Sequence, residues 1–107
     1  MDMIYQISSD DFEELIQDKK VFLLDVREKN EFETGHIEKA ILVPSTRFDE
    51  GFDGLKIKKR DKIALYCYSG NRSDFIAKKL EEKGYEKVYN LEMGIVEWLD
   101  YGKKLEK

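Results

Sequence analysis

The sequence of 107 residues is long enough to build one hydrophobic core but not two, so we expect a single domain over residues 1–107. Hydrophobic residues make up 41% and charged residues 39%, which indicates a soluble globular protein with a densely charged surface. The formal net charge of -4 argues against nucleic acid as the main partner, because phosphate binding needs clustered Lys and Arg. No apolar run approaches the roughly 18 residues of a membrane span, and the first residues lack the pattern of a signal peptide. We therefore expect a cytoplasmic protein that has no membrane partner.

The chain opens with two apolar runs of strand length that are separated by a helical pattern. Ile4–Ile7 predicts a first strand, and Ser8 or Ser9, followed by two acidic residues, predicts the N-cap of a helix. Apolar residues at positions 12, 15 and 16 then recur at helical spacing. Val21–Leu24 is a second continuous apolar run, and charged residues follow it. This pattern predicts a second, parallel strand whose end emerges from a sheet.

The middle of the chain carries weaker signals. Glu28–Thr34 is polar and predicts a short helix that ends at Gly35. Ala40–Val43 predicts a third strand, which the only proline, Pro44, halts, and we expect this short strand near an edge of the sheet. Ser45–Asp61 predicts only a turn and a loosely helical connection.

The second half repeats the alternation of strand and helix. Ile63–Tyr66 predicts a buried strand, and a helical period begins at Ser73 and ends near Gly84. Lys87–Leu91 predicts a fifth strand, and Gly94–Asp100 predicts a last helix whose residues 95, 98 and 99 share one face. Strands that alternate with helices predict an α/β fold in three layers, with a five-stranded parallel sheet and helices on both faces.

The strongest functional signal is the loop that joins the strand ending at Tyr66 to the helix beginning at Ser73. A loop in this position lies at the carboxyl edge of a sheet, where open α/β folds bind their ligands. Cys67 stands at its mouth, and a helix N-terminus together with Arg72 would stabilise the thiolate and make it nucleophilic. A lone cysteine after a strand is more often a buried core residue. The turn chemistry of Tyr68–Asn71 favours a reactive site instead.

The cysteine and histidine counts restrict the chemistry further. Cys67 is the only cysteine and His36 the only histidine, so no internal disulfide and no plausible zinc cage can form. We expect neither a metal nor another cofactor. The single cysteine also has no partner thiol within the chain, so any group that it receives must leave to another molecule.

Three groups of residues resemble the rhodanese-like (thiosulfate:cyanide sulfurtransferase) domain family in its single-domain form. They are Leu24-Asp25-Val26-Arg27-Glu28 with Glu31-Phe32 and Gly35-His36-Ile37, then Tyr66-Cys67-Tyr68-Ser69-Gly70-Asn71-Arg72-Ser73, and then Leu91 with Gly94 and Trp98. The resemblance implies a parallel sheet in the strand order 1-5-4-2-3 and a catalytic Cys67 that carries sulfur as a persulfide. Two positions depart from the usual pattern, Lys39 and Met93, and they bear on the shape of the pocket and the size of the substrate.

The resemblance also implies roles for the residues around the cysteine. The substrate-binding loop would consist of Tyr68, Ser69, Gly70, Asn71, Arg72 and Ser73, with Arg72 holding the sulfonate oxygens of the donor. Asp25, Arg27 and His36 would support this edge of the sheet rather than take part in catalysis, and Trp98 would be a core residue first and a pocket wall second.

Three functions are compatible with these observations. The first is a sulfurtransferase that passes sulfur from a small donor such as thiosulfate to cyanide, a thiol or a protein acceptor. The second is a phosphatase or arsenate reductase on the same fold, although its loop would hold five residues between Cys and Arg and this chain has four. The third is a non-catalytic binding module, a class that commonly lacks the cysteine. We expect the first.

Overall fold

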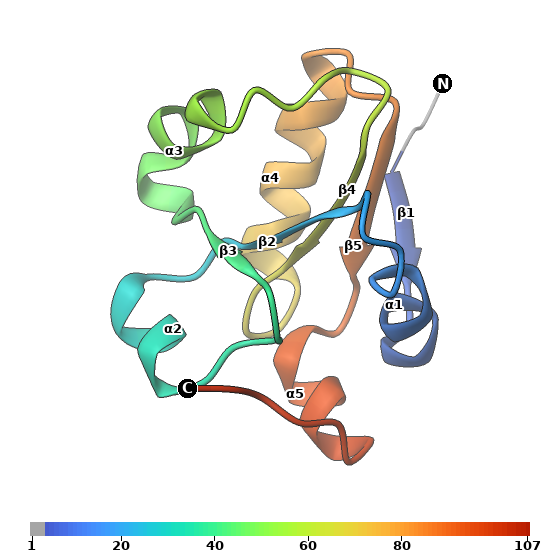
Figure 1. The fold of residues 1–107 in the computed structure, drawn as a ribbon, viewed down its shortest axis with the longest axis vertical. Helices are drawn as coiled ribbons and strands as arrows, with labels where there is room; N and C mark the ends of the chain where they lie inside the picture. The colour runs from blue at the N-terminus through green and yellow to red at the C-terminus, as the bar shows by residue number, and fades with distance from the viewer. Residues whose placement is uncertain (1–3) are drawn as a thin grey trace.

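The computed structural model describes residues 4–107, and all five strands in this range form one parallel sheet in the order β1-β5-β4-β2-β3 (Figure 1). This order confirms the one that the family resemblance implied. Met1–Met3, on which part of the signal-peptide prediction rests, lie outside the described residues. The strands are β1 (Ile4–Ile7), β2 (Phe22–Asp25), β3 (Ile41–Leu42), β4 (Lys62–Tyr66) and β5 (Lys87–Leu91).

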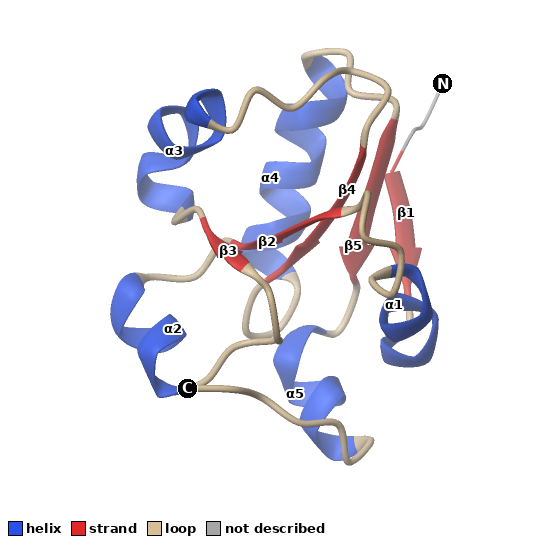
Figure 2. Cartoon of the chain, in the orientation of Figure 1, coloured by secondary structure: helices blue, strands red, loops and turns tan. Residues whose placement is uncertain are grey.

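Helices cover both faces of the sheet, as predicted (Figure 2). One face packs against α3 and α4, and the other face packs against α1 and α5. The helical segments are α1 (Ser9–Leu15), α2 (Lys29–Thr34), a 3-10 turn η1 (Ser45–Arg47), α3 (Phe48–Gly54), α4 (Asn71–Glu82) and α5 (Gly94–Asp100).

Strand β4 explains why its sequence is apolar without alternation. Successive side chains of a strand point to opposite faces, so Ile63 and Leu65 pack toward α3 and α4 while Ala64 and Tyr66 pack toward α1 and α5. All four residues are fully buried. A strand that is covered on both faces needs a continuous apolar run, because it has no side that faces water.

Several boundaries and faces differ from the predictions. Helix α4 begins at Asn71, two residues before the predicted start, because Gly70 adopts a left-handed conformation as its N-cap. Asn71 and Arg72 therefore lie in the first turn of the helix and not in the loop. Leu99 was predicted on the buried face of α5, but its side chain is half exposed. The weakly predicted segment 45–61 holds η1 and α3, whose two phenylalanines are buried core residues.

Other local predictions are confirmed. Ser8 is the N-cap of α1, where its side chain accepts a hydrogen bond from the backbone N–H of Asp11. Gly84 follows the C-cap of α4 with φ +95°, a conformation that glycine adopts without strain. Strand β3 is short and forms an edge of the sheet beside β2. Among residues 4–107, no helix combines the length and apolar character that a membrane crossing requires.

Candidate active site

The loop between β4 and α4 directs three hydrogen-bond donors at one sulfur atom. Sγ of Cys67 accepts from the backbone N–H of Gly70 at 3.1 Å and from the backbone N–H of Ser73 at 3.5 Å. The hydroxyl of Ser73 lies 3.4 Å from Sγ and 3.2 Å from the carbonyl oxygen of Gly70, so its single proton is shared between these two acceptors. Both Cys67 and Ser73 are buried, so solvent competes little for these donors. The donors and the positive end of the α4 dipole all favour negative charge on the sulfur.

Glycine is required at position 70 for two separate reasons. Its φ of +96° lies in the left-handed region, where a side chain is strained. A Cβ atom at this position would also overlap the backbone carbonyl of Glu92, the residue after β5. The close approach of these two backbones lets Gly70 turn its N–H back toward Cys67.

The N-terminus of α5 holds the loop from outside. Its first free amide groups donate to loop carbonyls, from Ile95 to Cys67 and from Val96 to Tyr68, both at 3.1 Å. Gly94 makes this contact possible, because a Cβ atom there would overlap the carbonyl group of Tyr68. With its carbonyls bound to α5, the loop is free to direct N–H groups toward the sulfur.

Arg72 forms a two-point ion pair that the sequence did not predict. Its two terminal nitrogens donate to the two carboxylate oxygens of Glu31 at 2.8 and 2.9 Å. The hydrogen bonds from Arg72 lower the pKa of Glu31 from 4.5 to about 2, and the backbone N–H of Glu28 contributes to the same shift. We expected Arg72 to hold a donor anion, but in this structure a carboxylate of the chain occupies its guanidinium group.

A second ion pair lies below the loop and is buried. Arg27 donates to both carboxylate oxygens of Asp25, with a shortest distance of 2.7 Å, and also to the carbonyl of Gly35 at 2.6 Å. The hydroxyl of Tyr66 accepts from the backbone N–H of Ile37 at 3.0 Å. Burial raises the pKa of Tyr66, and the nearby Asp25 carboxylate adds to the effect. Together these contacts attach the ends of β2 and β4 to the turn at residues 35–37.

His36 is held by contacts with Phe32 and Glu106. Its ring stacks on Phe32 with 3.8 Å between centroids, and Nδ1 lies 3.1 Å from the carbonyl oxygen of Phe32. Its backbone exchanges two hydrogen bonds of 2.7 Å with Glu106. Among residues 4–107, no hydrogen bond or ring contact joins His36 to Cys67. The supporting role of His36 stays a prediction.

The rest of the predicted loop faces outward. Tyr68, Ser69 and Asn71 are exposed. A shallow hollow of about 350 Å³ lies beside the start of α4. Its lining consists of Ser45, Thr46, Asn71, Arg72 and Phe75. The lining thus comes from η1 and the first turns of α4, and Cys67 is not part of it.

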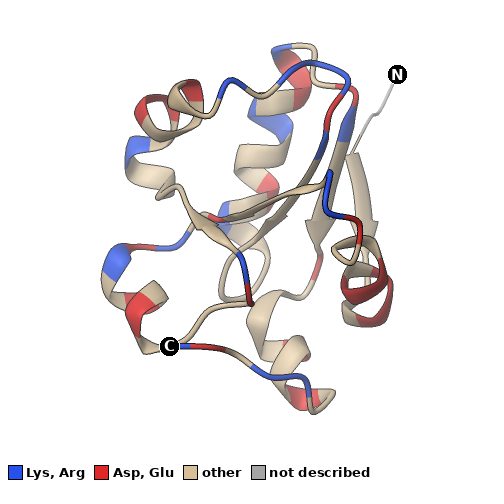
Figure 3. Cartoon of the chain, in the orientation of Figure 1, with Lys and Arg blue, Asp and Glu red and all other residues tan. Residues whose placement is uncertain are grey.

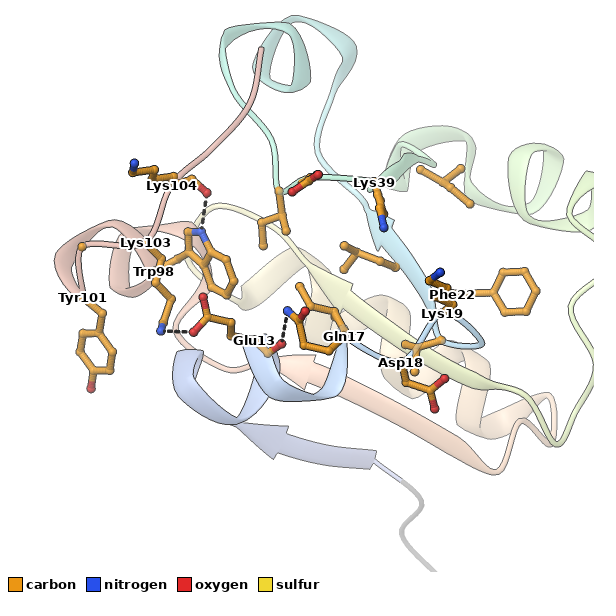
Figure 4. Close-up of a pocket in the computed structure, with 17 residues that line it drawn as sticks. Glu13, Gln17, Asp18, Lys19, Phe22, Lys39, Trp98, Tyr101, Lys103 and Lys104 are labelled. Atoms are coloured by element: carbon orange, nitrogen blue, oxygen red, sulfur yellow. Dashed lines mark hydrogen bonds and ion pairs between the residues drawn. The ribbon is translucent and has the colours of Figure 1, made fainter.

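A larger hollow of about 800 Å³ lies elsewhere, between α1, the start of β2 and the residues that follow α5 (Figure 4). Lys39 and Trp98 both line it, and neither Cys67 nor any loop residue does. Trp98 is also buried in the core, so it is both core residue and pocket wall. The departure at Lys39 thus affects this hollow, whereas Met93 lies at the N-cap of α5 beside the loop and is half exposed.

No cluster of three or more His, Cys, Asp or Glu side chains arranged to hold a metal ion occurs among residues 4–107. The residues that the site adds to the predicted ones are Glu31 and the α5 terminus at Gly94. Glu31 had a local signal, because Glu28 and Glu31 have the spacing of a capping box, and both of its hydrogen bonds are present. No local pattern could have shown that Glu31 also contacts Arg72, which is 41 residues away.

Comparisons with known proteins agree with this geometry. The family model of the rhodanese-like domain matches residues 8–101. A tRNA uridine(34) hydroxylase from Hamiltonella defensa is 38% identical over 95 residues, and one from Yersinia pestis is 33% identical over 98 residues. These matches cover 85% and 88% of this chain but only 27% and 28% of the hydroxylases. The chain therefore spans about a quarter of the length of these curated relatives.

Solved structures match over nearly the whole chain. A rhodanese-related protein from Thermoplasma volcanium is 30% identical, has a TM-score of 0.81, and is matched over 95% of this chain and 97% of that one. The polysulfide-sulfur transferase homodimer from Wolinella succinogenes has a TM-score of 0.84 at 20% identity, over 96% and 78% of the two chains. The second likeness shows a common fold only.

Proposed function

The chain belongs to the rhodanese-like domain family, and from that premise we propose that it is a sulfurtransferase that carries sulfur as a persulfide on Cys67. The observation that supports the proposal most directly is the convergence of three donors on Sγ of Cys67, from Gly70 and Ser73. Such donors lower the energy of a thiolate, and of the charged persulfide that replaces it, in the way that an oxyanion hole stabilises oxygen.

The proposed reaction has two displacement steps. In the first, the Cys67 thiolate attacks the outer sulfur of a donor, the new S–S bond forms, and the donor's own bond to that sulfur breaks. With thiosulfate as donor, sulfite leaves with the bonding electron pair. In the second step an acceptor such as cyanide attacks the terminal sulfur of the persulfide, and thiocyanate leaves while the Cys67 thiolate is restored. Charge and electrons balance in both steps without a metal or a redox cofactor.

Because the chain has a single cysteine, the persulfide-loaded protein should persist until an acceptor molecule arrives. With no second cysteine in the chain, the persulfide cannot resolve into an internal disulfide. It therefore waits for a molecule from solution, which is cyanide, a small thiol or the thiol of an acceptor protein. Tyr68 and Ser69, the two residues after Cys67, are exposed to solvent and accessible to such an acceptor.

The tRNA uridine(34) hydroxylases provide a second candidate, action on an RNA uridine, on the strength of 33% to 38% identity. The net charge of -4 opposes it. Basic residues are scattered over many elements and intermixed with acidic ones (Figure 3). RNA binding by this chain would need clustered basic residues that attract phosphates. We therefore expect no salt-sensitive binding of tRNA, which a gel-shift assay at low ionic strength would test.

Intact mass after sulfur loading tests the sulfurtransferase proposal. The protein is incubated separately with thiosulfate and with an alkyl persulfide, excess donor is removed, and the mass is measured before and after cyanide. The expected result is one added sulfur atom on the wild type, none on Cys67→Ser, and removal of the added sulfur by cyanide. Absence of loading from both donors, while a known sulfurtransferase loads, would favour the binding module. Turnover of a phosphate ester in a parallel assay would favour the phosphatase.

A further inference from the structure

The ion pair between Glu31 and Arg72 lies beside the Cys67 loop, and we call the surface formed by Glu31, Thr46 and Arg72 the rim. The ion pair cancels the positive charge that a sulfur donor would meet there. Glu31 contacts the Arg72 guanidinium through both of its carboxylate oxygens, which is the geometry that Arg uses for anions such as sulfonate. The carboxylate therefore occupies the same donors that an oxyanionic substrate would need. Arg72 lies in the first turn of α4, one residue before Ser73, whose backbone N–H donates to the sulfur of Cys67.

A second carboxylate, that of Glu28, lies next to the residues of this rim. Glu28 also acts on the charge of Arg72, and its Oε2 accepts a hydrogen bond from the hydroxyl of Thr46 at 2.9 Å. Thr46 and Arg72 both line the hollow beside the loop. Glu31 is the carboxylate that hydrogen-bonds the guanidinium, and it remains ionised throughout the neutral range because its pKa is about 2.

We propose that Glu31 sets the donor specificity of the site by occupying Arg72, so that doubly charged donors such as thiosulfate are disfavoured and thiol persulfides of low charge are preferred. The inference rests on the proposed sulfurtransferase function. A persulfide R–S–SH transfers its outer sulfur to the Cys67 thiolate and releases R–S⁻, and neither the donor nor the leaving group needs a cation at the rim. Thiosulfate brings two negative charges to a site where Arg72 is already bound to Glu31.

Glu31→Gln tests this role with little change in structure. Glutamine keeps the size of the side chain and can still accept the hydrogen bond that Oε1 receives from the backbone N–H of Glu28 at 3.1 Å, so the capping box of α2 remains possible. The substitution removes only the charge that competes for Arg72. Glu33→Gln is the matched control, because Glu33 lies on the same helix, is exposed, and loses the same charge.

The measurement is the rate of sulfur loading from two donors, thiosulfate and the persulfide of 2-mercaptoethanol. We expect Glu31→Gln to load from thiosulfate about tenfold faster than the wild type, the lower end of what a charge-assisted hydrogen bond contributes. Its rate with the alkyl persulfide should change little, and Glu33→Gln should resemble the wild type with both donors. Added salt should reduce the gain, because it screens the attraction between Arg72 and thiosulfate. Arg72→Gln in the Glu31→Gln background should abolish the gain.

A second variant protects the test against misfolding of the first. Glu28→Gln should raise thiosulfate loading in the same direction and by a smaller factor, because Glu28 acts on Arg72 without a direct hydrogen bond. Equal thiosulfate rates in wild type, Glu31→Gln and Glu28→Gln, with normal loading from the alkyl persulfide, would overturn the specificity role and leave the sulfurtransferase function standing. Absence of loading from either donor in every variant would instead refute the proposed function itself.

Discussion

Replacement of Gly70 by alanine should damage both the stability and the chemistry of the protein, for reasons that the structure separates. The left-handed φ of +96° costs a side chain about 1–2 kcal/mol. The new Cβ atom would also overlap the carbonyl of Glu92, which belongs to the backbone and cannot rotate away. Forced overpacking of this kind costs roughly 1–3 kcal/mol more. We therefore expect Gly70→Ala to lower the free energy of unfolding by about 2–5 kcal/mol.

Two other glycines provide matched controls. Gly84 has nearly the same φ, +95°, but the nearest atom to a Cβ added there would be the flexible Lys59 side chain at 4.0 Å. Gly84→Ala should therefore show the conformational cost alone, about 1–2 kcal/mol. Gly54 lies at the end of α3 with nothing within 4 Å of such an added atom. Gly54→Ala should be neutral or should stabilise the protein by about 0.5–1 kcal/mol.

Denaturant unfolding of the three variants, together with their rates of sulfur loading on Cys67, measures both effects. Gly70→Ala must shift the loop to relieve the overlap, and a displacement of about 1 Å in a catalytic group can reduce a rate about 100-fold. Gly84→Ala and Gly54→Ala should load at the wild-type rate once their folded fractions are taken into account. If Gly70→Ala were no less stable than Gly84→Ala and loaded as fast, the close approach to Glu92 would not be what shapes the loop.

Three further predictions concern single hydrogen bonds and pH. Ser73→Ala keeps the N–H donor on the sulfur but removes the hydroxyl, which contacts both the sulfur and the carbonyl of Gly70. Loading should slow by about tenfold and the free energy of unfolding should fall by about 0.5–1.5 kcal/mol, and an unchanged loading rate would contradict the hydroxyl's role. Tyr66→Phe leaves the buried N–H of Ile37 without its acceptor and should lower the free energy of unfolding, measured with denaturant, by about 1–3 kcal/mol. An unchanged free energy of unfolding would mean that another acceptor, such as water, replaces the hydroxyl. Arg72 lowers the folded-state pKa of Glu31 from 4.5 to about 2, so the stability that this ion pair contributes is present above pH 4.5 and is lost as the pH falls toward 2. The difference in free energy of unfolding between wild type and Glu31→Gln should therefore shrink over that pH interval.

The sequence by itself determined the framework of this protein. Continuous apolar runs marked the strands, because a strand that is covered on both faces must be apolar throughout. Alternation with helical patterns indicated a parallel sheet, and the family resemblance supplied its strand order, which the structure confirms. The segment from Tyr66 to Ser73 placed the candidate site at the carboxyl edge, because turn residues between a strand and a helix are a local signal.

Boundaries and faces were harder to predict, because they depend on backbone conformation and on neighbours. The start of α4 at Asn71 follows from the left-handed conformation of Gly70, which a loop prediction from residue types does not show. The exposure of Leu99 depends on how α5 is rotated against the sheet, and its apolar character alone does not determine that. Segment 45–61 contributes Phe48 and Phe52 to the hydrophobic core, and only the tertiary structure shows this packing.

Only the tertiary structure decided which charge and which backbone meet the loop. Glu31 lies 41 residues before Arg72 in the chain, and the two side chains meet because β2 and β4 are neighbours whose carboxyl ends share one edge. The backbone carbonyl of Glu92, just after β5, leaves no room for a side chain at Gly70, and the loop carbonyls are held by α5. Local patterns report the conformation that a segment prefers, whereas the partner of a charged or close-packed group is fixed by chain crossovers that bring distant residues together.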